Sequence, residues 1–168
     1  MVIIRVAVKE ELSYIREQRL AAYEEHASKI PEAHWQALRK SILSDGDLET
    51  GVERIIVEID GKIMGSVALF SPEIKAYDGL LEDELGYPEL RMLAISSESR
   101  GKGIATLLIN ECIKRAKEKG FSEMGLHTAD FMEDAIKLYE RLGFERLSQF
   151  DFEPANDGII VKAFRIRF

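Results

Sequence analysis

A glycine-spaced polar stretch just past the middle of the chain carries the chemistry that this sequence indicates most clearly. It reads Arg100-Gly101-Lys102-Gly103 and lies between the apolar run Leu93-Ala94-Ile95 and a run with helical periodicity. The first backbone N–H groups of a helix have no internal partner, and the aligned peptide dipoles place partial positive charge there. Glycine lets a phosphate approach the backbone, and the arginine and lysine add formal charge. The stretch therefore predicts a site for a phosphorylated ligand, most simply a diphosphate.

Two well-known phosphate-binding loops do not fit this spacing. A Walker A loop needs a Gly-Lys pair followed by Ser or Thr, and the sequence contains no such triplet. A dinucleotide fold needs Gly-x-Gly-x-x-Gly or Ala, but the third position after Gly101 and Gly103 is Thr106. Glu123 stands at roughly the right distance for a ribose-binding acid, but it begins the next predicted strand instead of ending it. Both loops are therefore disfavoured.

A third pattern fits: Arg or Gln, two residues, Gly, one residue, then Gly or Ala. Arg100, Gly103 and Ala105 match it. This is the coenzyme A signature of the GCN5-related N-acetyltransferase (GNAT) family, and the chain resembles that family. A second block, residues 135–144, reads Ala-Ile-Lys-Leu-Tyr-Glu-Arg-Leu-Gly-Phe and is similar to the last helix of the family with its Leu-Tyr-x-x-x-Gly-Phe ending. Both blocks occur in the family's order, with a separation that fits it.

The rest of the sequence supplies the elements that would position these two blocks. Apolar periodicity and turn signals predict strands at 2–8, 53–60, 62–70, 89–96, 122–128, 144–152 and 159–168, and helices at 11–27, 31–43, 103–119 and 131–142. Residues 71–88 predict a long loop with one helical turn near 80–85. The order β-α-α-β-β-β-α-β-α-β-β predicts a single α/β domain over residues 1–168. The resemblance implies one mixed, mostly antiparallel central sheet flanked by helices.

Composition limits the classes of function that remain. Among the 168 residues, 46% are hydrophobic and 32% are charged, which suits one globular domain. A net charge of −7 argues against a general nucleic-acid binder. No apolar run approaches a membrane span, the first residues do not resemble a signal peptide, and the single cysteine allows no intrachain disulfide. We therefore expect a cytoplasmic protein that binds neither nucleic acid nor membrane.

The resemblance implies where acetyl-CoA would bind. The pantetheine arm would run along Leu93-Ala94-Ile95, whose backbone groups would also hold the oxyanion of a tetrahedral intermediate if the strand splays there. The diphosphate would be held by the loop and the start of the helix, comprising Arg100, Gly101, Lys102, Gly103, Ile104, Ala105 and Thr106. One departure stands out, because Met132 occupies a position where relatives often carry a coenzyme-binding Asn. Asp130 or backbone groups would have to replace that contact.

Tyr139 is the predicted general acid. A thiol has a pKa of about 8.5 and a phenol of about 10, so a well-placed tyrosine can protonate the leaving thiolate at little cost. The resemblance implies that Tyr139, four residues before Gly143, occupies the position at which the family carries this general acid. The competing interpretation is a tyrosine that only packs on an amphipathic helix.

Glu89 is the predicted general base. An alkyl ammonium has a pKa of about 10.4 and must lose a proton before its nitrogen attacks, which a carboxylate acting through water can promote. Glu89 begins the strand that leads to the glycine-spaced stretch, where many relatives carry such an acid. A solvated acid at the end of a loop is an equally good interpretation. The weaker candidate bases are Glu73, Asp130 and His127, the last more simply a hydrogen-bonding histidine at a strand end.

The sequence thus predicts an acetyl-CoA-dependent N-acetyltransferase that transfers directly to a primary amine of a small molecule or protein. Cys112 lies on the apolar stripe of its helix and is expected to be a core thiol, not an acyl carrier. No residue cluster has metal-ligand spacing, so no metal is expected. The acidic residues 71–89 suggest a cationic acceptor, or simply a solvated face. A non-catalytic acyl-CoA-binding sensor and an enzyme for longer acyl groups remain alternatives, and the oligomeric state stays open, with a homodimer as one option.

Overall fold

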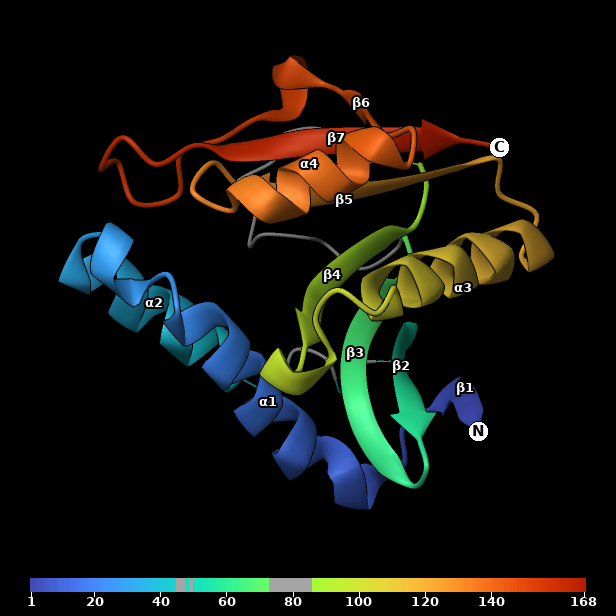
Figure 1. Ribbon diagram of the computed structural model, residues 1–168. Coiled ribbons are helices and arrows are strands. Elements are labelled where there is room, and N and C mark those ends of the chain that lie inside the picture. The colour runs from blue at the N-terminus through green and yellow to red at the C-terminus, as the bar shows by residue number, and fades with distance from the viewer. Residues whose placement is uncertain (45–47, 49, 73–85) are drawn as a thin grey trace.

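The computed structural model describes residues 1–44, 48, 50–72 and 86–168. In this part of the chain, seven strands form one sheet in the order β1-β2-β3-β4-β5-β7-β6, and four α-helices flank it (Figure 1). Neighbouring strands are antiparallel except for the parallel pair β4 and β5. The strands are β1 (Val2–Val6), β2 (Val52–Ile59), β3 (Lys62–Phe70), β4 (Glu89–Ile95), β5 (Glu123–Ala129), β6 (Glu145–Arg146) and β7 (Val161–Arg167), and the helices are α1 (Leu12–Glu24), α2 (Glu32–Ile42), α3 (Ile104–Glu118) and α4 (Glu133–Arg141).

This architecture confirms the predicted fold class and the predicted order of strands and helices. The predicted hairpin at Asp60-Gly61 joins β2 to β3, and both residues have positive φ angles, as this kind of tight turn requires. The predicted helix at 11–27 is α1 followed by a short 3-10 turn, Ala27–Lys29. The helical turn expected near 80–85 and the acids Glu73, Asp78, Glu82, Asp83 and Glu84 lie outside the described residues.

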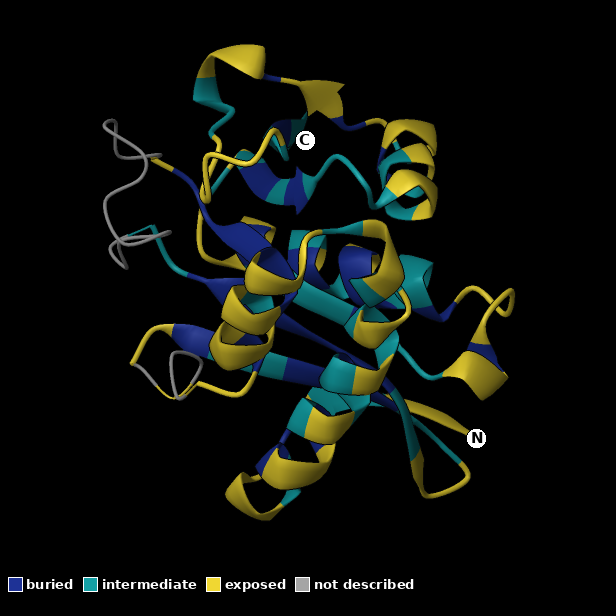
Figure 2. Ribbon diagram, turned by 90° about the vertical axis from the view of Figure 1, so that its left-hand side faces the viewer, coloured by how far each residue is buried: buried dark blue, intermediate teal, exposed yellow. Residues whose placement is uncertain are grey.

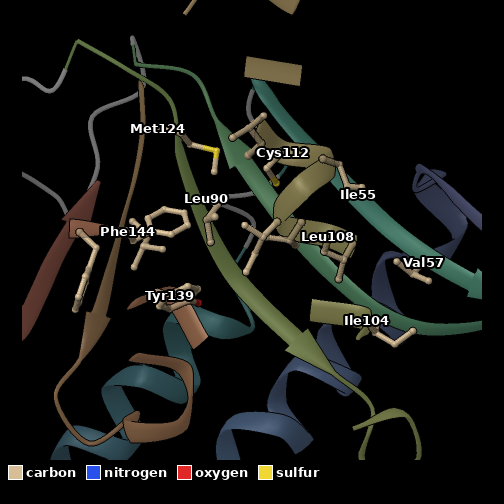
Figure 3. Close-up of a cluster of buried hydrophobic side chains, with 14 residues drawn as sticks. Ile55, Val57, Leu90, Ile104, Leu108, Cys112, Met124, Tyr139 and Phe144 are labelled. Atoms are coloured by element: carbon tan, nitrogen blue, oxygen red, sulfur yellow. The ribbon is translucent and has the colours of Figure 1, made fainter. Parts of the chain in front are cut away.

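Two apolar layers cover the two faces of the sheet. Successive side chains of a strand point to opposite faces, so Ile55 and Ile56 of β2 enter different layers. Ile56 packs with Leu12 and Ile15 of α1, whereas Ile55 belongs to the larger cluster that includes Leu108 of α3. Figure 3 shows this larger cluster, and Figure 2 shows the buried strands beneath helices whose outer faces are exposed. The sheet therefore separates the α1 side from the α3 side.

The prediction of a continuous strand at 144–152 was wrong. β6 covers only Glu145–Arg146, and a 3-10 turn at Ser148–Phe150 follows it. The Arg146 guanidinium makes two hydrogen bonds of 2.6 Å with the Asp151 carboxylate, which also accepts the backbone N–H of Ala163 on β7. A side chain thus takes the hydrogen bond that a continuing strand would have made, and the chain leaves the ladder.

An ion-pair group at the edge of the sheet predicts how stability depends on pH. Arg5 of β1 donates to both oxygens of Glu11 at 2.9 and 2.7 Å and to Glu58 of β2 at 2.7 Å. The Arg5 hydrogen bonds hold the pKa of Glu11 below its ordinary value of 4.5. A carboxylate with a lowered pKa stabilises the fold above its unfolded pKa, and that contribution is lost as the pH falls through its folded pKa.

Replacing Glu11 by glutamine is therefore expected to cost about 1 kcal/mol at pH 7. The difference from the wild type should stay constant from pH 7 to about pH 5 and shrink as the pH falls below about 4.5. Urea unfolding at several pH values measures this, with the exposed neighbour Glu10→Gln as the matched control. An equal loss of stability at every pH would contradict the assignment.

Candidate functional site

β4 and β5 separate soon after they begin, and this divergence opens the sheet. They pair only at Glu89 with Gly125 and at Leu90 with Leu126 within the described residues. Beyond these pairs the strands splay apart, as Figure 1 shows. Among the residues that the structure describes, no strand therefore pairs with Leu93-Ala94-Ile95 on the β5 side, where an extended ligand could bond to the backbone.

A bulge in β4 accompanies this divergence. Arg91 lies opposite Ala68 of β3, and Ala94 lies opposite Ser66, so two residues of β4 face one residue of β3. One of the two, Met92, has a φ angle of 59°, which is uncommon for a residue other than glycine. A bulge interrupts the ladder and bends its strand. β4 thus diverges from β5 on one side and carries a bulge against β3 on the other, and no local signal in its residues marks the bulge.

The glycine-spaced loop delivers the start of α3 to the open end of β4. Gly101 and Gly103 have φ angles of 76° and 78°, and a Cβ atom on either would meet nothing within 4 Å. The first backbone bond of the helix runs from the Leu107 N–H to the Gly103 carbonyl. The backbone N–H groups of residues 104–106 come before this first helical hydrogen bond, so they can donate to an anion. The helix dipole adds partial positive charge at the same place. The loop can therefore hold a diphosphate without steric conflict from its own glycines.

The charged residues of this loop differ in their surroundings. Arg100 donates to the Glu25 carboxylate at 2.6 Å, and both side chains are about half exposed. Lys102 is exposed, and its ammonium contributes positive charge at the loop surface. Since Glu25 directly follows α1, the Arg100 bond joins the predicted diphosphate loop to the end of that helix. Arg100 must share its charge between Glu25 and any bound phosphate.

Tyr139 of α4 lies in the apolar cluster beside this opening. Its side chain is 5% exposed and contacts the rings of Phe144 and Phe164 at centroid distances of 5.7 and 6.5 Å. Figure 3 shows it in the same cluster of buried side chains as Leu90 of β4. Burial, and then the nearby Tyr23 and Cys112, raise the pKa of Tyr139 above its ordinary value. The phenol is therefore protonated at neutral pH, and within the described part of the chain no hydrogen bond engages its hydroxyl.

Tyr23 was not predicted as a site residue, because its spacing is that of an ordinary packing position on α1. Its hydroxyl donates to the Leu93 carbonyl of β4 over a long 3.5 Å. Burial raises the pKa of Tyr23, although Arg19 and Arg91 partly oppose this. Tyr23 and Tyr139 therefore place two protonated phenols near the open edge of β4, from opposite faces of the sheet. No signal in the sequence singles out the first of them.

Glu89 is buried and does not behave as a solvated acid at a loop end. It is 5% exposed, and its Oε2 atom lies 2.7 Å from Nδ1 of His127 on β5. Its other oxygen, Oε1, is buried and has no hydrogen-bond partner among the described residues. Leu93 lies four positions after Glu89, which at about 3.3 Å per residue is about 13 Å along the strand. A proton from a group near Leu93 would reach this carboxylate through water.

The other residues considered from the sequence lie in different surroundings. The Asp130 carboxylate accepts the backbone N–H of Ile160 at 3.1 Å and so fixes the turn after β5, which Met132 then connects to α4. Burial raises the pKa of Cys112 to about 12, so its thiol is not ionised at neutral pH. Among residues 1–44, 48, 50–72 and 86–168, no group of three His, Cys, Asp or Glu side chains could hold a metal ion. The helices of the same residues are too short or too polar to cross a membrane.

One family model and several known proteins match this chain in sequence. The model of the acetyltransferase (GNAT) family matches residues 13–144. The probable N-acetyltransferase camello of Xenopus tropicalis is 34% identical over 91 residues, which are 54% of this chain and 37% of that protein. The N-acetyltransferase YjgM of Escherichia coli is 34% identical over 92 residues, which are 55% of this chain and 50% of that protein. The chain spans about a third to a half of the length of these relatives.

Solved structures share the fold. The PaiA N-acetyltransferase of Thermoplasma acidophilum, determined in complex with coenzyme A, superposes with a TM-score of 0.72 at 17% identity, covering 100% of this chain and 99% of that one. YncA of Salmonella typhimurium, determined with acetyl-CoA, has a TM-score of 0.65 at 18% identity, covering 99% and 94%. At these identities the likeness establishes the fold, and it confirms the predicted fold family.

Proposed function

Because the chain belongs to the acetyltransferase (GNAT) family, we propose that it is an acetyl-CoA-dependent N-acetyltransferase that transfers the acetyl group directly to a primary amine of a small molecule or protein. One observation carries most of the weight: the free edge of β4 at Leu93-Ala94-Ile95 leads straight into a glycine-spaced helix start. This arrangement suits an extended arm that ends in a diphosphate. Two structural relatives, PaiA and YncA, were determined with coenzyme A or acetyl-CoA.

The residues that would hold acetyl-CoA fit its two chemically distinct parts. Backbone groups of Leu93, Ala94 and Ile95 would bond to the amides of the pantetheine arm. Backbone N–H groups of Ile104, Ala105 and Thr106 would bond to the diphosphate together with Arg100 and Lys102, while Gly101 and Gly103 leave room for it. When bound, acetyl-CoA supplies an activated thioester. A backbone N–H group that the bulge of β4 releases from the ladder would stabilise negative charge on the oxygen of its carbonyl.

Tyr139 and Glu89 would then move the protons. The reaction forms an N–C bond and breaks the C–S bond, and the acceptor ammonium gives up two protons. Tyr139 is the proposed donor of the proton that reaches the sulfur, and one of the two protons from the nitrogen then restores its hydroxyl. The other leaves through water to Glu89, whose Oε1 atom is the proposed acceptor. The buried, apolar surroundings of both groups strengthen such hydrogen bonds.

An assay of free thiol tests the proposed function. The chain is incubated with acetyl-CoA and a panel of amines that includes polyamines, amino acids and lysine peptides. The expected result is saturable release of thiol that depends on one class of amine, with acetylated amine found by mass spectrometry. Saturable binding of acetyl-CoA with no release over the whole panel would instead identify a binding module of the same fold.

Direct transfer makes a specific prediction for Cys112. Since its buried thiol is not ionised at neutral pH, it cannot carry the acetyl group between donor and acceptor. Cys112→Ala is expected to retain kcat within about twofold of the wild type, although the small cavity costs about 1 kcal/mol of stability. Steady-state kinetics and urea unfolding measure the two effects. Loss of turnover in a folded variant would point to an acyl-enzyme route.

A further inference from the structure

The strongest unexplained feature of the molecule is a buried histidine beside the proposed base. His127 Nδ1 lies 2.7 Å from Glu89 Oε2, and His127 Nε2 lies 3.2 Å from the Phe150 carbonyl oxygen. The His127 side chain is 1% exposed and that of Glu89 is 6% exposed. Glu89 lies in the first pair between the parallel strands β4 and β5, and His127 lies one residue after the last of these pairs.

These two contacts favour a pair that holds two protons. A carbonyl oxygen can only accept a hydrogen bond, so Nε2 of His127 carries a proton. The short contact between Nδ1 and Oε2 requires a second proton between those atoms, because two lone pairs at 2.7 Å would repel. The pair is therefore either an imidazolium with a carboxylate or a neutral imidazole with a carboxylic acid. Both forms are electrically neutral as a pair, which suits a buried site.

We propose that His127 is a positioning residue for Glu89, that the pair rests as an imidazolium and a carboxylate, and that Glu89 Oε1 is the atom that takes the proton of the acceptor. This inference rests on the proposed N-acetyltransferase function. An imidazole is ordinarily more basic than a carboxylate, so the shared proton belongs on His127. In this state the Nδ1–H of His127 donates to Oε2 of Glu89 and fixes the orientation of the carboxylate.

The same contact also selects which oxygen can react. The Nδ1–H group of His127 donates a hydrogen bond to Oε2 of Glu89, whereas Oε1 has no hydrogen-bond partner among the described residues. A water molecule carrying the proton from the acceptor ammonium therefore finds one available oxygen. That proton rests on Oε1 while the amide forms, and it returns to solvent through the same water before the next turnover. His127 keeps its two protons throughout and acts only through Glu89.

The charged and titratable neighbours of the pair favour this state. Asp151, after the 3-10 turn that follows β6, lies within electrostatic reach of His127 and supports a positive charge there, while Arg146 pairs with Asp151 and offsets part of the effect. Tyr87, just before β4, lies within electrostatic reach of Glu89. Burial and then Glu89 raise the pKa of Tyr87 to about 12, so it stays neutral. The ring of Phe152 packs against His127 at 5.5 Å between centroids.

The pH dependence of kcat/KM in a His127→Gln variant tests the proposal. Glutamine can still donate a hydrogen bond to Glu89 but carries no charge, so the carboxylate form is reached only at higher pH. At neutral pH we expect a loss of about tenfold or more in kcat/KM for the amine, with the KM for acetyl-CoA unchanged. The rising limb of the pH profile should move by about one pH unit to the alkaline side, with activity recovering there.

Three further variants define the outcome. Glu89→Gln should be poorly active at every pH, and the double variant should be no worse than Glu89→Gln alone, because His127 acts through Glu89. His34→Gln is the matched control for losing a buried histidine, since His34 also pairs with a carboxylate, Asp157, at 2.7 Å; its pH profile should keep the wild-type position. A wild-type profile in His127→Gln, or an equal loss at every pH, would overturn the proposal.

If the His127→Gln variant does not fold, a measurement on the wild-type chain still tests the proposal. Nitrogen-15 NMR of the side chain should find both ring nitrogens of His127 protonated at pH 7, and a ring with one unprotonated nitrogen would overturn the ion-pair state. This readout does not need turnover. If no amine is acetylated, the proposed function fails while NMR still decides the state of the pair. If Glu89→Gln is fully active, Glu89 is not the base, and the positioning role of His127 falls with it.

Discussion

Replacing Tyr139 by phenylalanine is expected to lower kcat by about a hundredfold to a thousandfold, with the affinity for acetyl-CoA unchanged. The substitution removes one oxygen atom and leaves the ring against Phe144 and Phe164. No hydrogen bond to the hydroxyl is lost within the described residues, so the melting temperature should stay near that of the wild type. Steady-state kinetics and calorimetric titration with coenzyme A measure the two quantities.

The pH profile adds a second check on Tyr139. Burial raises its pKa above the ordinary value of 10.0, so the hydroxyl remains a proton donor throughout the range in which proteins are usually assayed. Its ionisation should therefore produce no falling limb in kcat below pH 10. A falling limb that is present in the wild type and absent from Tyr139→Phe would contradict this assignment.

Tyr23→Phe is the matched control, because it removes the other phenol near the edge of β4. The Tyr23 hydroxyl bonds only weakly to the Leu93 carbonyl, at 3.5 Å, so this variant is expected to lose less than about tenfold in kcat. A larger loss in Tyr23→Phe than in Tyr139→Phe would transfer the acid role to α1. Wild-type turnover in Tyr139→Phe would remove Tyr139 from the proposed chemistry.

Replacing Gly103 by valine is expected to weaken binding of coenzyme A by about a hundredfold, or about 2.7 kcal/mol. Gly103 has a φ angle of 78°, which costs a side-chain-bearing residue about 1–2 kcal/mol. The space around its Cα is open in the structure, and in our proposal the diphosphate fills that space. A branched side chain would therefore obstruct the phosphate and displace the amides that bind it. Calorimetric titration with coenzyme A measures the loss.

Gly120→Val separates obstruction from backbone strain. Gly120 lies after the other end of α3 with a φ angle of 88°, and its Cβ position is also open. The variant thus carries comparable strain and should bind coenzyme A as the wild type does. Equal affinity in Gly103→Val and Gly120→Val would mean that the helix start does not hold the diphosphate.

The donor half of the proposed site could be predicted from sequence because its determinants are local. Residues 93–106 are contiguous, and a strand, two glycines and a helix start follow one another whatever the rest of the fold does. The order of strands and helices was predictable for the same reason, since periodicity and turn residues act over short stretches. The prediction of a strand at 144–152 was wrong because it depended on a distant contact. The Asp151 carboxylate accepts the backbone N–H of Ala163 on β7, and this hydrogen bond replaces one of the ladder.

The rest was decided only by tertiary structure. The bulge at Met92 depends on the register between β3 and β4, and no residue type within β4 marks it. Glu89 and His127 lie 38 residues apart and meet because two parallel strands align. Tyr23 reaches Leu93 across 70 residues because α1 packs over β4. Short-range preferences set each element, whereas pairings between distant residues arise from packing and strand register, which a single sequence does not display.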